Sequence, residues 1–176
     1  DYGSGNLRSV AKAFERIGGQ VQVTRSTDDI AAASHIVLPG VGAFRDAIHE
    51  LQRLKLVEPI RDHVRQDKPF LGICLGLQLL FDVGYEDGEW QGLGILPGSV
   101  VRFPEMQDLK VPHMGWNQVS QAVDHPLWHE IPDRARFYFV HSYFIEAGRP
   151  GQVVGRGHYG NDFAAAVLFL LRRLGI

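Results

Sequence analysis

The spacing of apolar residues predicts helices and short strands that alternate through the first half of the chain. Apolar positions from Leu7 to Ile17 recur at intervals of three or four, and Gly18-Gly19 ends the run. This spacing is typical of an amphipathic helix. The same reading predicts strands at residues 21–24, 35–38 and 70–73, and helices at 27–33 (capped by Ser26 or Thr27), 44–54, 56–65 and 75–81.

The pattern changes after Gly84, where short β-rich runs are separated by Gly, Pro and Asp. Strands alternating with helices favour a parallel sheet covered on both faces, whereas the later runs favour a more antiparallel portion. We therefore expect a single α/β domain over residues 1–176: a three-layer sandwich with a mostly parallel central sheet and a smaller antiparallel β portion. Its later strands are predicted at 94–96, 100–103, 116–119, 136–140, 152–155 and 163–167, with a terminal helix over 168–173.

Composition narrows the class of protein. A net charge of −2 leaves no basic field to hold nucleic acid or an anionic membrane. The sequence has no apolar run approaching the roughly 18 residues of a membrane span. One cysteine cannot form an intrachain disulfide, which fits a reducing, cytoplasmic compartment. The sequence opens at Asp1 without a methionine, so we expect the natural start to lie upstream.

The single cysteine lies between two glycines, in Gly72-Ile73-Cys74-Leu75-Gly76. A strand before it and a helix after it make this the cysteine counterpart of the nucleophile elbow, a strained turn that exposes its side chain. A Cβ at either glycine would collide with a neighbouring strand or helix. The first turn of the helix would favour the thiolate. The alternative, a buried structural cysteine, leaves the glycine pair unexplained.

The segment Pro39-Gly40-Val41-Gly42 directly follows the predicted strand at 35–38. In open α/β sheets, loops at the carboxyl ends of strands line the active crevice, so this loop is expected beside the elbow. Backbone N–H groups of Gly40, Val41 and Gly42, together with that of Leu75, are candidates for an oxyanion hole. An ordinary turn is the alternative.

The glycine-rich opening does not indicate a dinucleotide site. Arg8 stands where a dinucleotide fingerprint has its third glycine, and no acidic residue ends the next predicted strand. We expect instead a loop capped by Ser4 or Asn6 that leads into the first helix. No cofactor is expected.

The histidines do not indicate a metal site either. His125 and His129 are four residues apart, but Pro126 lies between them and no third ligand stands at a recognisable spacing. His63 is expected on a solvated helix face.

Two segments are rich in aromatic residues with polar tips, 112–117 (PHMGWN) and 137–143 (FYFVHSY). Ordinary core strands would explain Phe137, Phe139 and Val140. The alternation leaves Tyr138 and His141 for other roles, such as a pocket wall or a protein interface.

Taken in order, these segments resemble one family. The chain is similar to the glutaminase subunits of imidazole glycerol phosphate synthases, which are class I, triad-type glutamine amidotransferases of histidine biosynthesis. Gly-x-Cys-x-Gly marks only the broad superfamily, whereas PHMGWN together with YFVHSY points to this subunit. The likeness covers residues 1–167 and includes 1–7 (DYGSGNL), 39–42 (PGVG), 157–160 (GHYG) and 163–167 (FAAAV).

The resemblance implies a mechanism. Cys74 would attack the side-chain amide of glutamine, ammonia would leave, and water would release glutamate from a thioester. Gln78 and the main chain near Ser142 and Tyr143, next to His141, would hold the glutamine.

The resemblance also implies a partner. The chain would form a heterodimer with a (β/α)₈-barrel cyclase that combines the ammonia with a nucleotide, giving imidazole glycerol phosphate and an aminoimidazole carboxamide ribotide. Asn6, Met114, Trp116, Asn117 and Tyr138 would lie near that partner.

The sequence departs from the family at one decisive place. The family's catalytic histidine and glutamate lie in a QFHPEK stretch soon after the strand that ends here at Val167, and this sequence contains no such stretch. Ammonia must be protonated as it departs, and a general acid of this kind contributes about 10²–10⁴-fold. His141 and His158 are poor substitutes, since the family uses the segment of His141 for substrate and interface contacts.

Two explanations remain open. We favour the view that the sequence lacks residues of the natural protein, the family's first strand and the His-Glu segment, because removing a central strand would leave an unpaired edge. In the alternative, the chain is a catalytically dead docking subunit of the same complex. A cysteine hydrolase of related fold is a third hypothesis, but it leaves the segment 113–116 unexplained.

Overall fold

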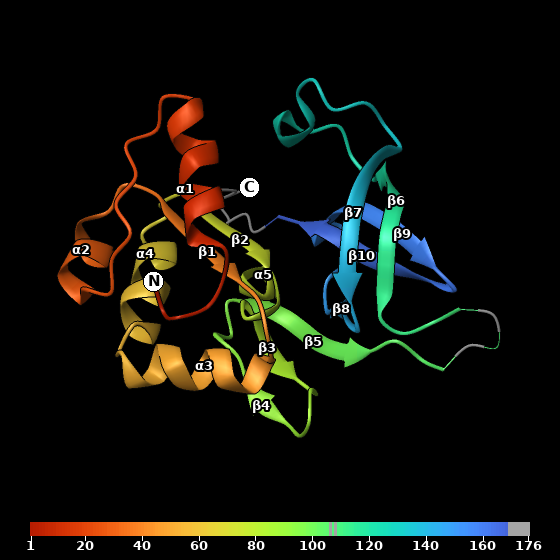
Figure 1. The fold of residues 1–176 in the computed structure, drawn as a ribbon, viewed down its shortest axis with the longest axis horizontal. Coiled ribbons are helices and arrows are strands. Elements are labelled where there is room, and N and C mark those ends of the chain that lie inside the picture. Colours follow the sequence, from red (N-terminus) through yellow and green to blue (C-terminus); the bar gives the residue numbers. More distant parts are fainter. Residues whose placement is uncertain (106, 108, 169–176) are drawn as a thin grey trace, which may run out of the picture. The chain divides into compact units, whose positions relative to one another are not determined.

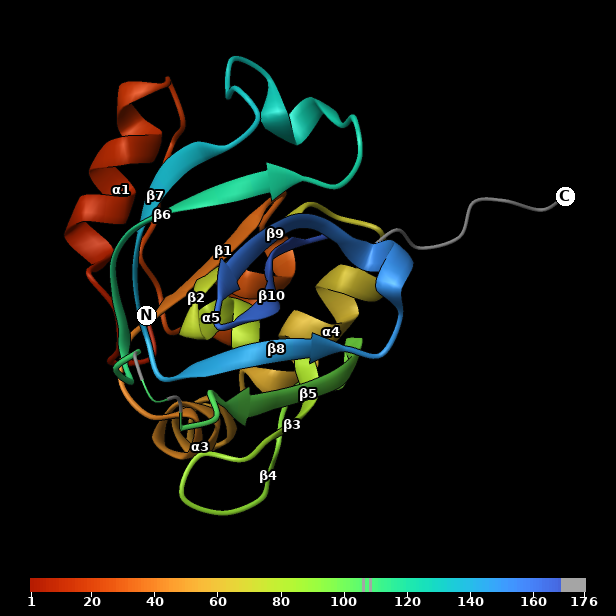
Figure 2. The ribbon, with the colours of Figure 1, turned by 90° about the vertical axis from the view of Figure 1, so that its right-hand side faces the viewer.

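The computed structural model describes residues 1–105, 107 and 109–168. The chain divides into two compact units, Asp1–Ile95 and a second unit that begins at Leu96. Figure 1 labels the helices and strands of both units, and Figure 2 shows the same ribbon turned by 90°. Each unit is described by itself.

In the first unit, helices surround a two-stranded parallel sheet. Strands β1 and β2 run in parallel with Ile36 opposite Phe70 and Gly40 opposite Cys74, so both strands end at the same level. Strands β3 and β4 form a short antiparallel pair. The elements in chain order are α1 (Leu7–Arg16), α2 (Thr27–Ala32), β1 (Ile36–Gly40), α3 (Phe44–Arg53), α4 (Val57–Arg65), β2 (Phe70–Cys74), α5 (Leu75–Gln78), β3 (Phe81–Gly84) and β4 (Trp90–Gln91).

The four helices predicted before β2 are confirmed to within one or two residues, and local caps explain their ends. Asn6 Oδ1 accepts from the N–H of Ser9 at the start of α1, and Ser26 Oγ accepts from Asp29 at the start of α2. Helix α3 is capped from a distance, because the Phe44 N–H donates to Glu86 Oε2 at 2.6 Å.

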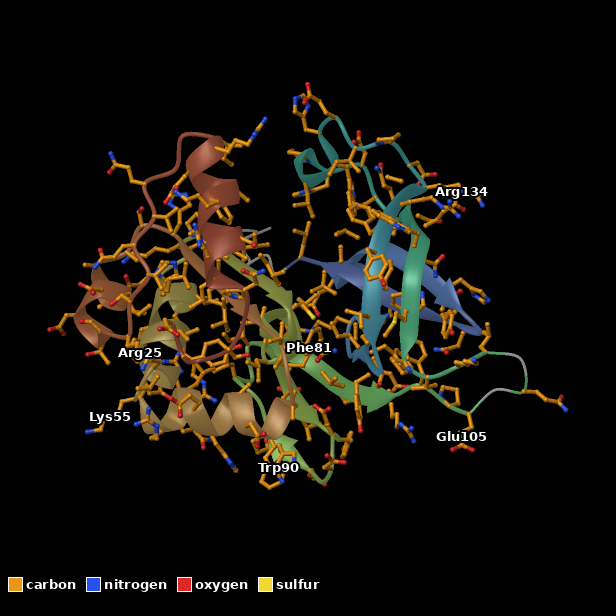
Figure 3. All side chains as sticks on the ribbon, in the orientation of Figure 1. Arg25, Lys55, Phe81, Trp90, Glu105 and Arg134 are labelled. Carbon is orange, nitrogen blue, oxygen red and sulfur yellow. The ribbon has the colours of Figure 1, made fainter. Side chains whose placement is uncertain are left out.

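The core of the first unit lies where α3, α4 and the segment after α5 meet. Leu51, Leu79 and Leu93 have no exposed surface. Figure 3 labels Phe81, which is buried in this core, and Trp90 of β4, whose ring meets His49 edge-on at 5.1 Å. Burial of these apolar side chains is the main stabilising contribution to the unit.

Two predictions in this unit are wrong. Residues 21–24 are extended but form no strand, since no ladder partner lies beside them among the described residues. The helix predicted over 75–81 ends at Gln78 and is followed by β3. The helix does not continue, because the carbonyl groups of Leu79 and Leu80 accept hydrogen bonds from the N–H groups of Leu93 and Ile95 instead of from the next helical turn.

A cavity of about 660 Å³ lies between α1, the extended segment 20–24 and β1. The apolar residues Leu7, Val10 and Phe14 of α1 line this cavity, and no residue of α1 is buried. Helix α1 therefore contributes no fully buried side chain to the core of the unit.

The second unit is an antiparallel sheet. Its strands pair in the order β5-β8-β10-β9-β6-β7, around a core of Phe103, Phe144 and Phe163. The elements are β5 (Leu96–Arg102), β6 (His113–Gln121), η1 (Pro126–Trp128), β7 (Ala135–His141), β8 (Tyr143–Ala147), η2 (Pro150–Gln152), β9 (Val153–Tyr159) and β10 (Asn161–Val167).

The α/β class is confirmed, while the balance of strands differs from expectation. Strands β1 and β2 are parallel, whereas the strand pairs of the second unit are antiparallel, and the antiparallel portion of the described residues is the larger one. Strand β8 was not predicted as a separate element, and residues 94–95 are not a strand. The predicted terminal helix falls on residues that are almost all outside the described range. Within that range, no helix has the length and apolarity needed to cross a membrane.

Candidate active site

Cys74 occupies the predicted strained turn between β2 and α5. Its backbone has φ +55° and ψ −119°, a combination that L-residues adopt only when the surrounding structure forces it. The side chain is exposed and the thiol is free. The geometry expected for a nucleophile elbow is confirmed, while the role of the sulfur as nucleophile stays a prediction.

The two glycines that flank Cys74 are required by close packing, as the sequence indicated. A Cβ on Gly72 would lie 2.7 Å from the carbonyl oxygen of Gly76, and a Cβ on Gly76 would overlap the carbonyl oxygen of Leu38 in β1. Real side chains do not approach backbone atoms so closely. Helix α5 can therefore start against β1 only if both positions are glycine.

The 40–42 loop lies beside the elbow, as predicted. Gly40 is the register partner of Cys74 across the β1–β2 pair. A Cβ on Gly40 would lie 3.0 Å from the backbone nitrogen of Gly76 and would overlap the hydroxyl of Tyr2. Gly42 has φ +94°, a left-handed conformation that favours glycine. Backbone groups of the loop can thus approach a substrate at the elbow.

Two residues that sequence reasoning missed support this loop. The N–H of Val41 donates to Ser4 Oγ at 2.9 Å, and the Ser4 hydroxyl donates to the carbonyl of Val41. Tyr2 is 2% exposed, and its burial raises the pKa of its phenol, an effect that the nearby Ser4 opposes. Ser4 thus braces the 40–42 loop, while the helix cap proposed for Ser4 or Asn6 is made by Asn6.

The short α5 changes one electrostatic expectation. A helix over 75–81 was expected to favour the thiolate, but α5 has only 4 residues, so its dipole is small. Leu75 begins α5 and is buried, and Gln78 lies partly buried one turn after Cys74. The roles predicted for Leu75 and Gln78 stay predictions.

The predicted glutamine-binding residues of the second unit lie where β7 passes into β8. The carbonyl of Ser142 accepts from the N–H of Phe103 at 3.0 Å, and His141 Nδ1 donates to the carbonyl of Tyr143 at 2.9 Å. His141 Nε2 lies 2.8 Å from His113 Nδ1. Because both ring nitrogens of His141 are engaged, this histidine is not poised to act as a general acid or base. His158 pairs instead with Asp162 at 2.7 Å.

The predicted interface residues fall on different surfaces. Met114, Trp116, Tyr138 and Val140 project from one side of the β6–β7 pair, and we call this patch the aromatic face; Trp116 and Tyr138 are register partners, 64% and 57% exposed. Asn117 alternates to the opposite side of β6, where its Nδ2 donates to the carbonyl of His158.

Asn6 is exposed in the first unit, where it caps α1. Of the five residues predicted to lie near a partner, only Met114, Trp116 and Tyr138 share the aromatic face.

The placement of His63 was wrong. Its side chain is 2% exposed on α4, and its Nε2 donates to the carbonyl of Pro69 at 3.0 Å. It shares the inner face of α4 with Ile60 and Val64, a spacing that sets it among core positions. Burial lowers the pKa of His63.

His125, considered above as a metal ligand, accepts a hydrogen bond from the N–H of Leu127 and so caps η1. Over residues 1–105, 107 and 109–168, no group of three or more His, Cys, Asp or Glu side chains gathers at metal-binding distances.

The described residues from Asn161 to Leu168 contain neither histidine nor glutamate. Strand β10 ends at Val167, and the N–H of Leu168 donates to the carbonyl of Gln152. The chain therefore still pairs with the end of η2 immediately after β10.

Comparisons with protein families and with solved structures agree with the fold and with the strained turn at Cys74, and together they define a class of protein. The family model "Glutamine amidotransferase class-I" matches residues 1–163. A crystal structure of a glutamine amidotransferase shares the fold at a TM-score of 0.67 and 17% identity, covering 87% of this chain and 76% of that one. A second crystal structure, described as a "putative gmp synthase subunit a protein" of Thermoplasma acidophilum, shares the fold at a TM-score of 0.61 and 19% identity. The match covers 89% of this chain and 70% of that one.

Curated relatives narrow the class to one family. The imidazole glycerol phosphate synthase subunit HisH of Pseudomonas putida is 58% identical over 173 residues, which cover 95% of this chain and 81% of the relative. The HisH subunit of Nitrosococcus oceani is 51% identical over 170 residues with the same coverage. The chain belongs to this HisH family of class-I glutamine amidotransferases.

Substitution of Gly76 tests the close packing at the elbow. Gly76→Ala should lower the free energy of unfolding by about 3 kcal/mol or more, because its Cβ would overlap the Leu38 carbonyl and α5 would have to shift. Gly151→Ala is the matched control: no atom lies within 4 Å of its Cβ position, so its stability should stay within about 1 kcal/mol of the wild type. Urea denaturation measures both, and equal stability of the two variants would contradict this packing.

Three histidines, two of them buried and His141 partly buried, make stability depend on pH. Burial lowers the pKa of His63, His113 and His141, to about 4 for His113. The unfolded chain, with histidine pKa values near 6.5, therefore binds more protons, so the free energy of unfolding should fall as the pH drops from about 6.5 toward 4. Each histidine adds up to about 1.4 kcal/mol per pH unit to the slope.

Urea denaturation at several pH values gives this slope. His113→Phe should flatten it, whereas replacement of the exposed His129 by Gln should not. An unchanged slope in His113→Phe would contradict the assignment.

Proposed function

We propose that this chain hydrolyses glutamine to glutamate and ammonia through a thioester on Cys74, as the glutaminase subunit of an imidazole glycerol phosphate synthase. The observation that carries this proposal is the strained Cys74 backbone beside the 40–42 loop, in a chain of the HisH family. A generic cysteine hydrolase would share the elbow but would not account for 51–58% identity to HisH subunits.

The chemistry begins with the Cys74 thiolate. Its sulfur attacks the side-chain amide carbon of glutamine, the C–N bond breaks once the nitrogen is protonated, and ammonia leaves. Water then attacks the thioester carbon, which releases glutamate and restores the thiol. The exposed sulfur on a strained turn is accessible for the first step.

The tetrahedral intermediates carry a negative oxygen that needs hydrogen-bond donors. We assign the N–H of Leu75 and N–H groups of the 40–42 loop to this role. The N–H of Val41 is already donated to Ser4 Oγ, so its use requires that this hydrogen bond break. Gly40 and Gly42 flank Val41 and lower the cost of such a rotation.

The departing nitrogen needs a proton donor besides the residues of the elbow. His141 has both ring nitrogens engaged, so it is a poor candidate. We assign this role to a histidine and a glutamate such as the resemblance to the family implies after the strand corresponding to β10; the present sequence contains no such pair there.

Glutamine is held in this proposal by Gln78 and by the main chain at Ser142 and Tyr143, next to His141. The abrupt passage from β7 to β8 supports the second part of this assignment, because Ser142 breaks the ladder between the two strands.

The relatives are named as subunits of a synthase, which supports an obligatory partner. We propose that the partner is a (β/α)₈-barrel cyclase, which takes the ammonia and forms imidazole glycerol phosphate and an aminoimidazole carboxamide ribotide. The aromatic face supports this docking, since exposed aromatic and Met side chains are enriched at protein interfaces.

The proposal also assigns the protein to the cytoplasm. Its thiol is free and exposed, and the nucleophile must stay reduced to act.

Glutamine hydrolysis by the complex with the cyclase and its nucleotide substrate tests the function. Cys74→Ala should lower the rate at least about 10³-fold, because no other group can form the thioester. Binding of Cys74→Ala to the cyclase with wild-type affinity is the control. Should the wild-type complex use free ammonia but leave glutamine intact, the chain is a docking subunit and the glutaminase proposal is wrong.

Docking through the aromatic face is tested by truncation. Trp116→Ala and Tyr138→Ala should each weaken cyclase binding by about 10–100-fold, as expected when an aromatic anchor is lost. Leu127→Ala is the matched control, since Leu127 is an exposed apolar residue of η1 in the same unit. Equal binding of all three variants in a titration would show that another surface docks.

A further inference from the structure

The second unit contains a chain of hydrogen bonds whose direction is determined at every link. It starts at Asn117 on β6, passes through His113 on the same strand and His141 on β7, and ends at the carbonyl of Tyr143 on β8. His113 and His141 are register partners. His113 is 3% exposed, and its ring stacks on those of Phe139 and Tyr159.

The last link fixes the proton on His141. The carbonyl of Tyr143 can only accept, so His141 Nδ1 must carry the proton. Burial lowers the pKa of both histidines, to about 4 for His113, and both rings are therefore neutral near pH 7. A neutral ring has one donor and one acceptor, so His141 Nε2 must accept and His113 Nδ1 must donate to it.

The first link agrees with this direction. His113 Nε2 is left as an acceptor, and it lies 3.3 Å from Asn117 Nδ2. Two backbone contacts fix the orientation of the Asn117 amide, since its Nδ2 donates to the carbonyl of His158 and its Oδ1 accepts from the N–H of Gln118. Every member of the chain is satisfied by one arrangement of protons.

We infer that His113 is a positioning residue for glutamine binding: by donating to His141 Nε2 it holds His141 in the tautomer that fixes the Tyr143 carbonyl, and so orients the Ser142–Tyr143 main chain. This inference rests on the proposed function, which assigns that main chain to the substrate. Without the His113 donor, His141 can carry its proton on Nε2, and Nδ1 would then face the carbonyl of Tyr143 as a second acceptor.

The effect on kinetics follows from where the main chain acts. A group that holds glutamine contacts the ground state and the transition state equally, so its displacement raises KM and leaves kcat nearly unchanged. A loss of stability alone would lower the amount of folded enzyme without this split between KM and kcat.

The variant His113→Phe removes the Nδ1 donor, together with the Nε2 acceptor that faces Asn117, and keeps an aromatic ring between Phe139 and Tyr159. In the complex with the cyclase, it should raise KM for glutamine about five- to tenfold with kcat within about twofold of the wild type. His113→Asn returns an N–H near the position of Nδ1 and should restore KM to within about twofold.

A matched control separates positioning from packing. Phe163→Leu disturbs the same aromatic cluster, because Phe163 lies against both histidine rings at 5.7 and 5.2 Å, but it leaves every hydrogen bond of the chain in place. It should lower the melting temperature and leave KM unchanged.

The test is completed by measuring which ring nitrogen of His141 carries the proton. In ¹⁵N NMR spectra of the wild-type protein, His141 should be protonated on Nδ1 and unprotonated on Nε2, and His113→Phe should mix the two tautomers. A wild-type His141 protonated on Nε2 overturns the inference, even if His113→Phe fails to fold. So does an unchanged KM in a folded His113→Phe complex.

Failure of the proposed function gives a different result. In that case the wild-type complex hydrolyses no glutamine at all, whereas failure of this inference leaves wild-type hydrolysis intact and Cys74-dependent.

Discussion

The structure of the elbow depends on the absence of two Cβ atoms, where α5 begins against β1. Gly76 meets the Leu38 carbonyl and Gly72 meets the first turn of α5, with no room for a side chain at either position. This contact sets the path of the chain through Cys74 and leaves its backbone at φ +55°. Such a conformation costs of order 1–3 kcal/mol, and the full burial of Leu75 and Leu79 directly after it offsets that cost. The same contact aligns the ends of β1 and β2, so the 40–42 loop begins directly opposite Cys74.

In the second unit, the alternation of side chains along β6 and β7 separates two functions. Trp116 and Tyr138 project outward as register partners, while His113 and His141, three positions away along the same strands, project inward. The outer side chains keep the apolar exposure that docking requires. The inner histidines lose water, which lowers their pKa and keeps them neutral. A neutral pair can form a directed hydrogen-bond chain, whereas two charged rings would repel each other.

The elbow was predictable from sequence because its constraint is local. Glycine at two fixed distances from a cysteine, between an apolar strand and an apolar helix, is typical of few structures besides a tight turn, and Gly72 and Gly76 behave as expected. The errors involve hydrogen-bond partners that lie outside the segment from which each prediction was made. The end of α5 depends on Leu93 and Ile95, whose N–H groups donate to the carbonyl groups that follow α5. The burial of His63 depends on the Pro69 carbonyl, and the brace on Val41 depends on Ser4, 37 residues away. His113 was missed as a functional candidate because its importance lies in its register with His141, which composition does not reveal.

The hydrogen-bond chain bears directly on the missing acid. If His141 were free to turn, it could replace the family's histidine as a proton donor. Its Nδ1 proton is committed to Tyr143, and its Nε2 lone pair is committed to His113. Moving a proton through His141 would break both contacts and would place a charge in a cluster of aromatic rings, where desolvation opposes it. The same two hydrogen bonds that let His141 orient the main chain therefore prevent it from acting as a general acid or base. Protonation of the leaving ammonia thus needs a group outside this cluster, and this requirement, rather than the elbow, decides whether the chain hydrolyses glutamine or only docks.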